Sequence, residues 1–149
     1  MNILMMSGNT QGGYMAYVYG LVDSLQGTEM VGMAGAGDRK ECVFLVQVYA
    51  HVGHTGTWKQ GRKVFGDKSI PRGTAIATFV NGKYPSGDNA HKHAAFYLEQ
   101  DDSYIYVMDQ WTGKASNVSA RKISRKGGMR SDGTYHDASN NAEAFYVIE

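Results

Sequence analysis

The sequence is poor in the features that mark several large classes of protein. It has one cysteine and two prolines, and its net charge is only +1. A single cysteine cannot form a disulfide within the chain. A near-neutral charge argues against a dedicated nucleic-acid-binding protein, and the absence of long apolar runs argues against insertion into a membrane. We therefore expect neither nucleic acid nor a lipid bilayer as a partner.

What is present fits an ordinary globular protein. The 149 residues are 42% hydrophobic and include 19 glycines, which predicts one domain over residues 1–149 with many turns and little helix. The first residues, MNILMMSGNTQGG, have no basic segment followed by a sufficient apolar one. We therefore expect no signal peptide and a protein made in the cytoplasm.

The order of the predicted elements indicates an α+β fold. Residues 14–25 carry apolar side chains at helical spacing, and residues 27–37 form a glycine-rich loop. Asp38 is a candidate N-cap for a second helix over residues 39–52. Patterns typical of strands follow at residues 74–80, 93–100, 103–111, 120–124 and 142–149. Helices followed by a run of strands predict an antiparallel sheet with a helix packed on it.

The one cysteine, Cys42, falls in the first turn of the predicted helix 39–52. A thiol reacts as the thiolate, and its ordinary pKa is ~8.5. A helix N-terminus lowers that pKa, and its backbone amides can also hold the oxyanion that forms when a carbonyl is attacked. Cys42 is therefore a candidate nucleophile. The alternative is a small buried apolar side chain, the commoner role of a lone cysteine.

A cysteine nucleophile needs a histidine base, and five histidines are available: His51, His54, His91, His93 and His136. His51 lies more than two helical turns beyond Cys42, too far along the axis to reach the thiol. His51 and His54 are a weak signal for a metal because no further ligand accompanies them. His91 and His93 lie at the start of a predicted strand, which can present a ring toward a helix terminus.

Pairing of the next two strands selects His93. If residues 93–98 and 104–111 form a hairpin about a turn centred near residue 101, His93 faces Asp109, and Tyr97 faces Ile105. Asp109 could then orient the imidazole and leave its second nitrogen for the thiol. A shift of one residue would move Asp109 to the other face, and a strand-end pair of this kind is often only a surface contact.

Four stretches, ECVFLVQ, GTAIATFVNGKYP, HAAFYL and DQW, occur in this order over residues 30–123. Together they resemble the papain-like (CHAP-type) cell-wall cysteine amidases, and most closely the second family of type VI secretion amidase effectors. The resemblance implies a papain-like core with Cys42 as nucleophile, His93 as base and Asp109 as the orienting residue. It also implies that no cofactor is needed.

The same resemblance implies a function. Such effectors cleave peptide crosslinks of peptidoglycan in the periplasm of a target bacterium, after delivery by a secretion apparatus, and a cognate immunity protein protects the producer. The bond between diaminopimelate and D-alanine is favoured, and the bond between D-glutamate and diaminopimelate stays open. Two other functions are open as well: a phage or autolytic lysin, and a wall-binding module without catalysis.

Two further features have less specific interpretations. Gln110 and Trp111 follow Asp109 directly and are candidate substrate-contacting or shielding residues. Trp111 in particular is a candidate shield for the hydrogen bond of Asp109, or else an ordinary core or rim aromatic. Residues 114–130 contain no acid, and their basic side chains predict either a surface for an anionic partner or a solvated loop. Those side chains are Lys114, Arg121, Lys122, Arg125, Lys126 and Arg130.

Overall fold

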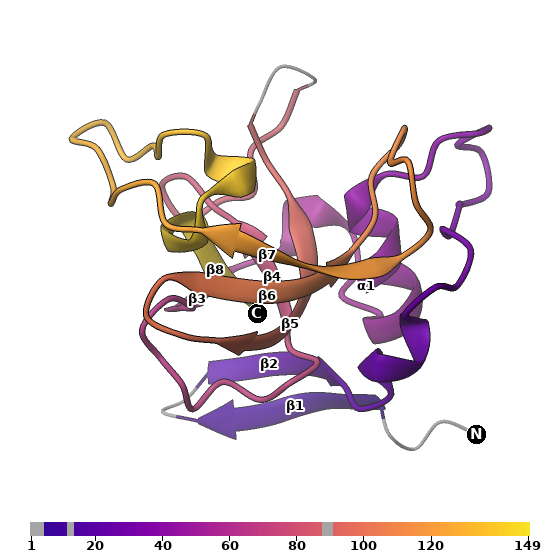
Figure 1. Cartoon of the computed structure of the whole chain (residues 1–149), viewed down its shortest axis with the longest axis horizontal. Helices are drawn as coiled ribbons and strands as arrows, with labels where there is room; N and C mark the ends of the chain where they lie inside the picture. The colour runs from indigo at the N-terminus through magenta and orange to yellow at the C-terminus, as the bar shows by residue number, and fades with distance from the viewer. Residues whose placement is uncertain (1–4, 12–13, 88–90) are drawn as a thin grey trace.

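The main element of the fold is a six-stranded antiparallel sheet (Figure 1). The computed structural model describes residues 5–11, 14–87 and 91–149. The strands lie in the order β3-β8-β4-β5-β6-β7. Their bounds are β3 Gln60–Lys63, β4 Ala75–Thr78, β5 Ala94–Gln100, β6 Tyr104–Asp109, β7 Ser119–Ser124 and β8 Phe145–Ile148. The predicted α+β class is confirmed, and each predicted strand corresponds to one of these.

One helix, α1 (Cys42–Ala50), packs on this sheet against β5. Its side chains Leu45 and Val46 are fully buried. The sheet meets them with small residues on β4 and β5, including Ala77 and Ala94, and with the larger Phe96. Small side chains let the helix backbone come close to the sheet, so the N-terminus of α1 is held at one end of β5.

The opposite face of the sheet has its own core. Alternate residues of β5 and β6, such as Ala95 and Val107, pack there with Phe145 and Val147 of β8. The central strands are therefore buried on both faces, which explains their nearly continuous apolar sequence. Of the helices within the described residues, none is long and apolar enough to cross a membrane.

The prediction of a helix over residues 14–25 is wrong. Residues Tyr14–Tyr19 form strand β2, which pairs with β1 (Met5–Gln11), and only Val22–Leu25 form a short 3-10 helix. Gly73 fixes this hairpin to the larger sheet, because its carbonyl accepts a hydrogen bond of 2.9 Å from the backbone N–H of Tyr19. A Cβ at Gly73 would collide with the Tyr19 backbone.

Asp38 is not the N-cap of the helix. The helix α1 begins at Cys42, and its N-cap is Glu41, whose side chain makes no capping hydrogen bond. The three short 3-10 helices that follow are η2 (Thr55–Thr57), η3 (Ala138–Asn140) and η4 (Ala142–Ala144). Because α1 begins at Cys42 and not at residue 39, Cys42 is its first helical residue. This position supports the prediction that the thiol lies at a helix N-terminus.

Candidate active site

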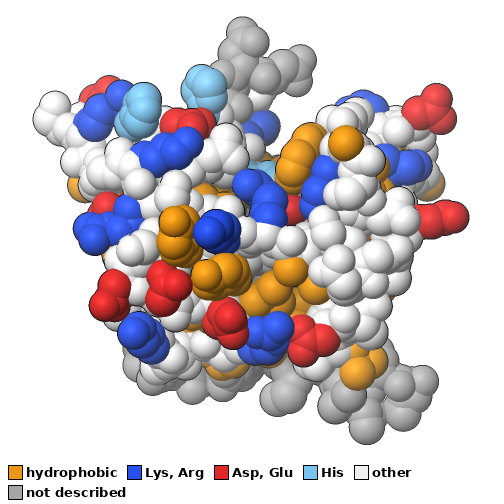
Figure 2. Space-filling view, viewed as in Figure 1, with side chains coloured by type: hydrophobic (Ala, Val, Ile, Leu, Met, Phe, Trp, Pro, Cys, Tyr) orange, Lys and Arg blue, Asp and Glu red, His pale blue; other side chains and the backbone are white. Residues whose placement is uncertain are grey.

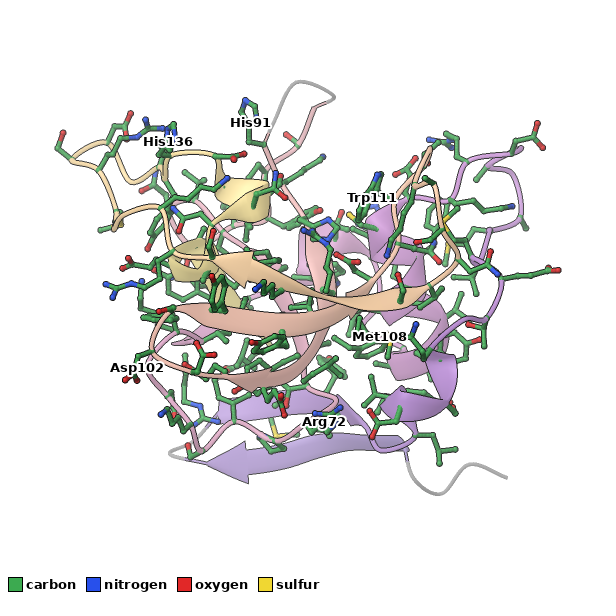
Figure 3. The ribbon with its side chains drawn as sticks, viewed as in Figure 1. Arg72, His91, Asp102, Met108, Trp111 and His136 are labelled. Atoms are coloured by element: carbon green, nitrogen blue, oxygen red, sulfur yellow. The ribbon has the colours of Figure 1, made fainter. Side chains whose placement is uncertain are left out.

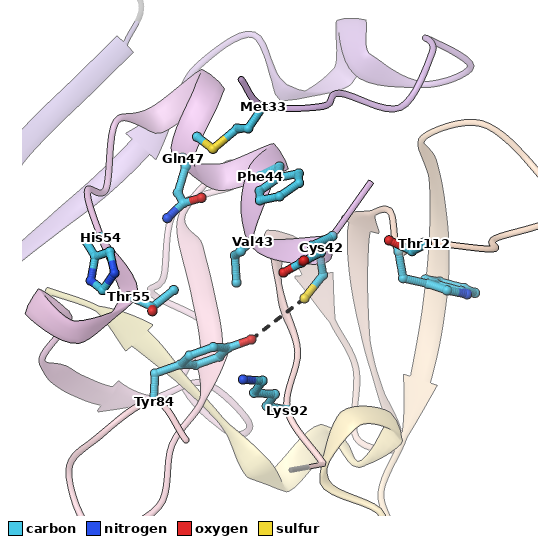
Figure 4. A pocket seen from close by; sticks show the side chains of 12 residues that line it. Met33, Cys42, Val43, Phe44, Gln47, His54, Thr55, Tyr84, Lys92 and Thr112 are labelled. Atoms are coloured by element: carbon cyan, nitrogen blue, oxygen red, sulfur yellow. Dashed lines mark hydrogen bonds between the residues drawn. The ribbon is translucent and has the colours of Figure 1, made fainter. Parts of the chain in front are cut away.

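Cys42 is partly exposed and lines a cleft of about 530 Å³ at the N-terminus of α1 (Figure 4). The first N–H groups of an α-helix have no partner within the helix, so this end of α1 favours a negative charge. The opposite wall of the cleft carries Tyr84, whose hydroxyl oxygen lies 3.8 Å from the Cys42 Sγ. The cleft thus presents the thiol to a molecule that enters from solvent.

His93 is buried next to Cys42, immediately before β5. Its backbone is fixed to β4, because its N–H donates to the Thr78 hydroxyl over 3.0 Å and its carbonyl accepts from the Thr78 N–H over 3.0 Å. Its ring meets Phe145 edge to face. Nε2 of the imidazole lies 2.7 Å from Oδ2 of Asp109, and the ring is near enough to the Cys42 thiol to lower the pKa of that thiol.

The predicted contact between His93 and Asp109 is present, but the predicted register is wrong. Tyr97 pairs with Val107 and not with Ile105, and a β-bulge between Tyr97 and Glu99 shifts the register again toward the turn. The difference at the open end of the hairpin is two residues, which keeps both side chains on the same face. His93 and Asp109 are therefore diagonal neighbours and not directly opposed ones.

The charges of this cluster favour an ion pair between sulfur and imidazole. Burial opposes ionisation of the Cys42 thiol, but the hydrogen bond and charge of His93 outweigh it, with help from the Ala94 N–H and the Tyr84 hydroxyl, and lower the pKa of the thiol. Burial also opposes protonation of His93, but Asp109 and Cys42 together raise its pKa to about 9. The thiolate and the imidazolium thus stabilise each other.

Asp109 is fully buried and is bound by two cations besides His93. Arg121 Nε donates to Oδ2 over 2.8 Å, and Lys114 Nζ donates to Oδ1 over 3.1 Å. Burial alone would raise the pKa of Asp109, but the hydrogen bond and charge of His93 and the charges of Arg121 and Lys114 lower it. The carboxylate therefore stays ionised and fixed in one orientation.

The interpretation of residues 114–130 as a solvated loop therefore does not hold for Lys114 and Arg121, the first two basic residues of the stretch. The Lys114 side chain is only 6% exposed. Arg121 lies on β7, two residues beyond Ser119, which pairs with Asp109. The register of β6 with β7 could have identified Arg121 as a neighbour of Asp109, since residues two apart on a strand share a face.

Gln110, a candidate substrate-contacting or shielding residue, lies inside the protein and away from the cleft surface. It is fully buried and does not line the cleft. Its amide oxygen accepts from the Val31 N–H over 2.8 Å, and its amide nitrogen donates to the carbonyls of Val31, Lys40 and Glu41. Gln110 therefore joins the end of β6 to the loop that leads into α1.

Trp111 lies over the charges around Asp109. Its ring meets that of His93 at 70° with the centroids 6.2 Å apart (Trp111 is labelled in Figure 3). The ring centroid is 4.8 Å from Lys114 Nζ and 5.0 Å from Arg121 Cζ. Trp111 is 37% exposed, so one side of the ring faces solvent while the other covers the cluster.

Two residues of the cleft were not singled out from the sequence. Tyr84 lies in the loop after β4, and Lys92 directly precedes His93. Burial and the nearby Cys42 raise the pKa of Tyr84, so its hydroxyl keeps its proton. Lys92 Nζ lies 5.4 Å from the centroid of the Tyr84 ring. No periodicity in the sequence marks either residue, because both lie outside regular structure.

His54, His91 and His136 have other settings than His93. His54 lines the far part of the cleft and accepts a hydrogen bond from the Gly56 N–H. His91 and His136 lie in loops away from Trp111 (Figure 3). Within the described ranges, no group of three or more His, Cys, Asp or Glu side chains is arranged to hold a metal ion.

Comparison with known proteins places this geometry in a family. Residues 16–148 match the family described as domesticated amidase effector 2. A type VI secretion amidase effector 2 protein from Salmonella typhi is 50% identical over 139 residues, which cover 91% of this chain and 100% of that protein. A solved structure of type 6 secretion amidase effector 2 (Tae2) matches with a TM-score of 0.82 and 50% identity, covering 89% of this chain and 94% of the other. The resemblance seen in the four sequence stretches is therefore confirmed, and this chain belongs to the type VI secretion amidase effector 2 family.

Proposed function

We propose that this amidase is a cysteine enzyme that hydrolyses peptide crosslinks of peptidoglycan, with Cys42 as nucleophile, His93 as base and Asp109 as the orienting residue. The observation that carries the proposal is the position of the His93 ring between the Cys42 thiol and the Asp109 carboxylate. A buried thiol without a basic partner would have a raised pKa and would be unreactive. Here the pKa of Cys42 is lowered instead.

The first half of the reaction forms a thioester. The Cys42 sulfur attacks the carbonyl carbon of the scissile amide, and its electron pair forms the new C–S bond. The backbone N–H of Cys42 and the hydroxyl of Tyr84 donate to the oxyanion that develops. His93 then gives its proton to the amide nitrogen, the C–N bond breaks, and the amine leaves.

The second half restores the enzyme. Neutral His93 takes a proton from a water molecule, whose oxygen attacks the thioester carbonyl. The C–S bond breaks, the carboxylic acid product leaves, and the thiolate is regenerated beside the protonated ring. Asp109 holds the imidazole by the 2.7 Å hydrogen bond throughout, so the same ring nitrogen faces the thiol in each step.

Digestion of purified peptidoglycan sacculi tests this proposal. The wild-type chain is expected to release peptide fragments whose masses identify the cleaved bond, either between diaminopimelate and D-alanine or between D-glutamate and diaminopimelate. Cys42→Ala and His93→Ala are expected to release none. If Cys42→Ala releases the same fragments as the wild type, the assigned nucleophile is wrong.

Labelling of Cys42 separates a catalytic protein from a wall-binding module with the same fold. Iodoacetamide near neutral pH is expected to modify Cys42 rapidly in the wild type and slowly in His93→Ala, because only a thiolate reacts quickly. Slow modification that is equal in both proteins would support the non-catalytic module.

We further propose that the enzyme acts in the periplasm of a target bacterium and that a small immunity protein blocks its cleft in the producing cell. The name of the Salmonella typhi relative supports delivery by a type VI apparatus. Expression in a Gram-negative host tests the site of action. Lysis is expected only when a signal peptide is added to direct the chain to the periplasm, and lysis from the cytoplasm would contradict the proposal.

A further inference from the structure

A second cavity, of about 350 Å³, opens on the other side of the catalytic pair. It is lined by Lys92, His93, Trp111, Arg121, Ser139 and Asn140. Lys92 and Trp111 also line the cleft of Cys42, so the two cavities adjoin across the Cys42–His93 pair. In the space-filling view, basic side chains lie beside hydrophobic ones on this face of the molecule (Figure 2).

The charge of this cavity is positive. Two cations, Lys92 and Arg121, line it, and none of the described residues that line it is acidic. The Asp109 carboxylate behind it is already bound by His93, Lys114 and Arg121. A bound anion would therefore meet cations without a competing exposed carboxylate.

Both cations have donors to spare for a ligand. The ammonium of Lys92 has three donors, of which one is given to the Pro85 carbonyl over 3.1 Å. The guanidinium of Arg121 has five, of which Nε binds Asp109 and Nη1 binds the Asn140 amide oxygen over 3.4 Å. The remaining donors of the two side chains suit a carboxylate, which accepts charge-assisted hydrogen bonds at both oxygens.

The direction of the proposed reaction says which part of the substrate meets this cavity. His93 protonates the leaving amine, so the residue that supplies the amine lies on the His93 side, while the acyl part lies in the cleft of Cys42. In both candidate bonds, diaminopimelate supplies the amine, and this amino acid carries a carboxylate on each of its two α-carbons. We propose that the cavity formed by Lys92 and Arg121 binds a free carboxylate of the amine-bearing residue, an inference that rests on the proposed function.

Two synthetic crosslinked peptides test this inference. They are identical except that the amine-bearing residue carries either a free carboxylate or a primary amide. The wild type is expected to cleave the carboxylate peptide with a kcat/KM about tenfold higher. Lys92→Met is expected to lose this preference through a higher KM for the carboxylate peptide, whereas Lys92→Arg retains most of it.

Lys122→Met is the matched control. Lys122 is also basic and lies on β7, but its ammonium faces the Tyr104 ring at 4.4 Å and does not line the cavity. It is expected to keep the full preference. Equal labelling of Cys42 by iodoacetamide in Lys92→Met and the wild type checks that the catalytic pair is intact.

Equal cleavage of the two peptides by the wild type would overturn the inference, as would an equal loss on both peptides in Lys92→Met. Failure of the proposed function would give a different result, because the wild type would then cleave neither peptide. In that case calorimetry can measure the binding of each of the two amine products to Cys42→Ala, and this comparison still tests the carboxylate site. Tighter binding of the carboxylate product, lost in Lys92→Met, supports the cavity, and equal binding contradicts it.

Discussion

Gln110 Nε2 donates a hydrogen bond of 3.0 Å to the carbonyl oxygen of Glu41, the N-cap of α1. This bond connects the residue after Asp109 to the residue before Cys42. The distance between the Asp109 carboxylate and the Cys42 thiol is therefore set by the buried side-chain amide of Gln110 as well as by the packing of the helix on the sheet. Gln110 is a positioning residue in this arrangement, because it does not line the cleft itself and acts through the backbone of Glu41.

Gln110→Ala is expected to lower both stability and kcat. The variant leaves buried backbone groups without a partner, which costs about 2 kcal/mol in the free energy of unfolding. The loop before α1 loosens, so kcat falls and Cys42 is alkylated more slowly, while KM changes less. Chemical denaturation and kinetics with a soluble peptide measure the two effects. Loss of stability with an unchanged alkylation rate would show that Gln110 does not position the thiol.

The pH dependence of the enzyme follows from the imidazolium. The pKa of His93 is about 9, so kcat/KM is expected to fall as the pH rises through 9 and the ring loses its proton. In Asp109→Asn this alkaline limb moves toward the ordinary value of about 6.5, because the carboxylate that raises the pKa is gone. NMR titration of the His93 ring measures both midpoints. An equal midpoint in the two proteins would contradict the role of Asp109.

Folding stability is linked to the same proton. The pKa of His93 is raised in the folded state, so its contribution to the free energy of unfolding is fully present below about pH 6.5 and is lost as the pH rises through 9. Denaturation of the wild type and His93→Gln at pH 6 and pH 9.5 measures it. The stability difference between the two proteins is expected to shrink at the higher pH. A constant difference would be inconsistent with the raised pKa.

Tyr84→Phe removes a hydroxyl that lies 3.8 Å from the Cys42 Sγ and keeps the ring that packs on Trp58. The expected result is a fall in kcat of about tenfold or more with little change in KM, because the hydroxyl donates to the oxyanion in the transition state. Tyr104→Phe is the control. Tyr104 lies at the end of β6 opposite Asp109, so this variant is expected to keep full activity. Unchanged kcat in Tyr84→Phe would leave the backbone amides as the oxyanion donors.

Trp111→Ala tests the shield over the Asp109 cluster. Water then reaches the ion pairs of Asp109 with Arg121 and Lys114, whose strength depends on a low local dielectric constant. We expect a several-fold fall in kcat and slower alkylation of Cys42, because His93 is held less firmly. Circular dichroism checks that the protein is folded. Unchanged turnover in the folded variant would reject the shielding role.

Local pattern was sufficient for the strands that carry the site and insufficient for the N-terminal region. The alternation and apolar content of β5 and β6 predict strands, and the start of α1 is predicted within a few residues. Residues 14–19 were predicted as helix because their apolar spacing also fits a helix. The partner that makes them a strand is β1, which directly precedes them in the chain, and the apolar spacing of residues 14–25 taken alone does not reveal that pairing.

The amino-acid sequence by itself determined the chemical groups available: one thiol, a histidine at the start of a strand, and a carboxylate on the next strand. Only the tertiary structure decided the start of α1 at Cys42, because the Lys40 carbonyl is bound by Gln110, which follows β6 and is distant in the chain. It also decided the register of the hairpin, through the bulge near Tyr97, and it brought Arg121 and Lys114 onto Asp109. Electrostatic and hydrogen-bond energies depend on distances in space, and residues far apart in the chain reach those distances only after the sheet has formed.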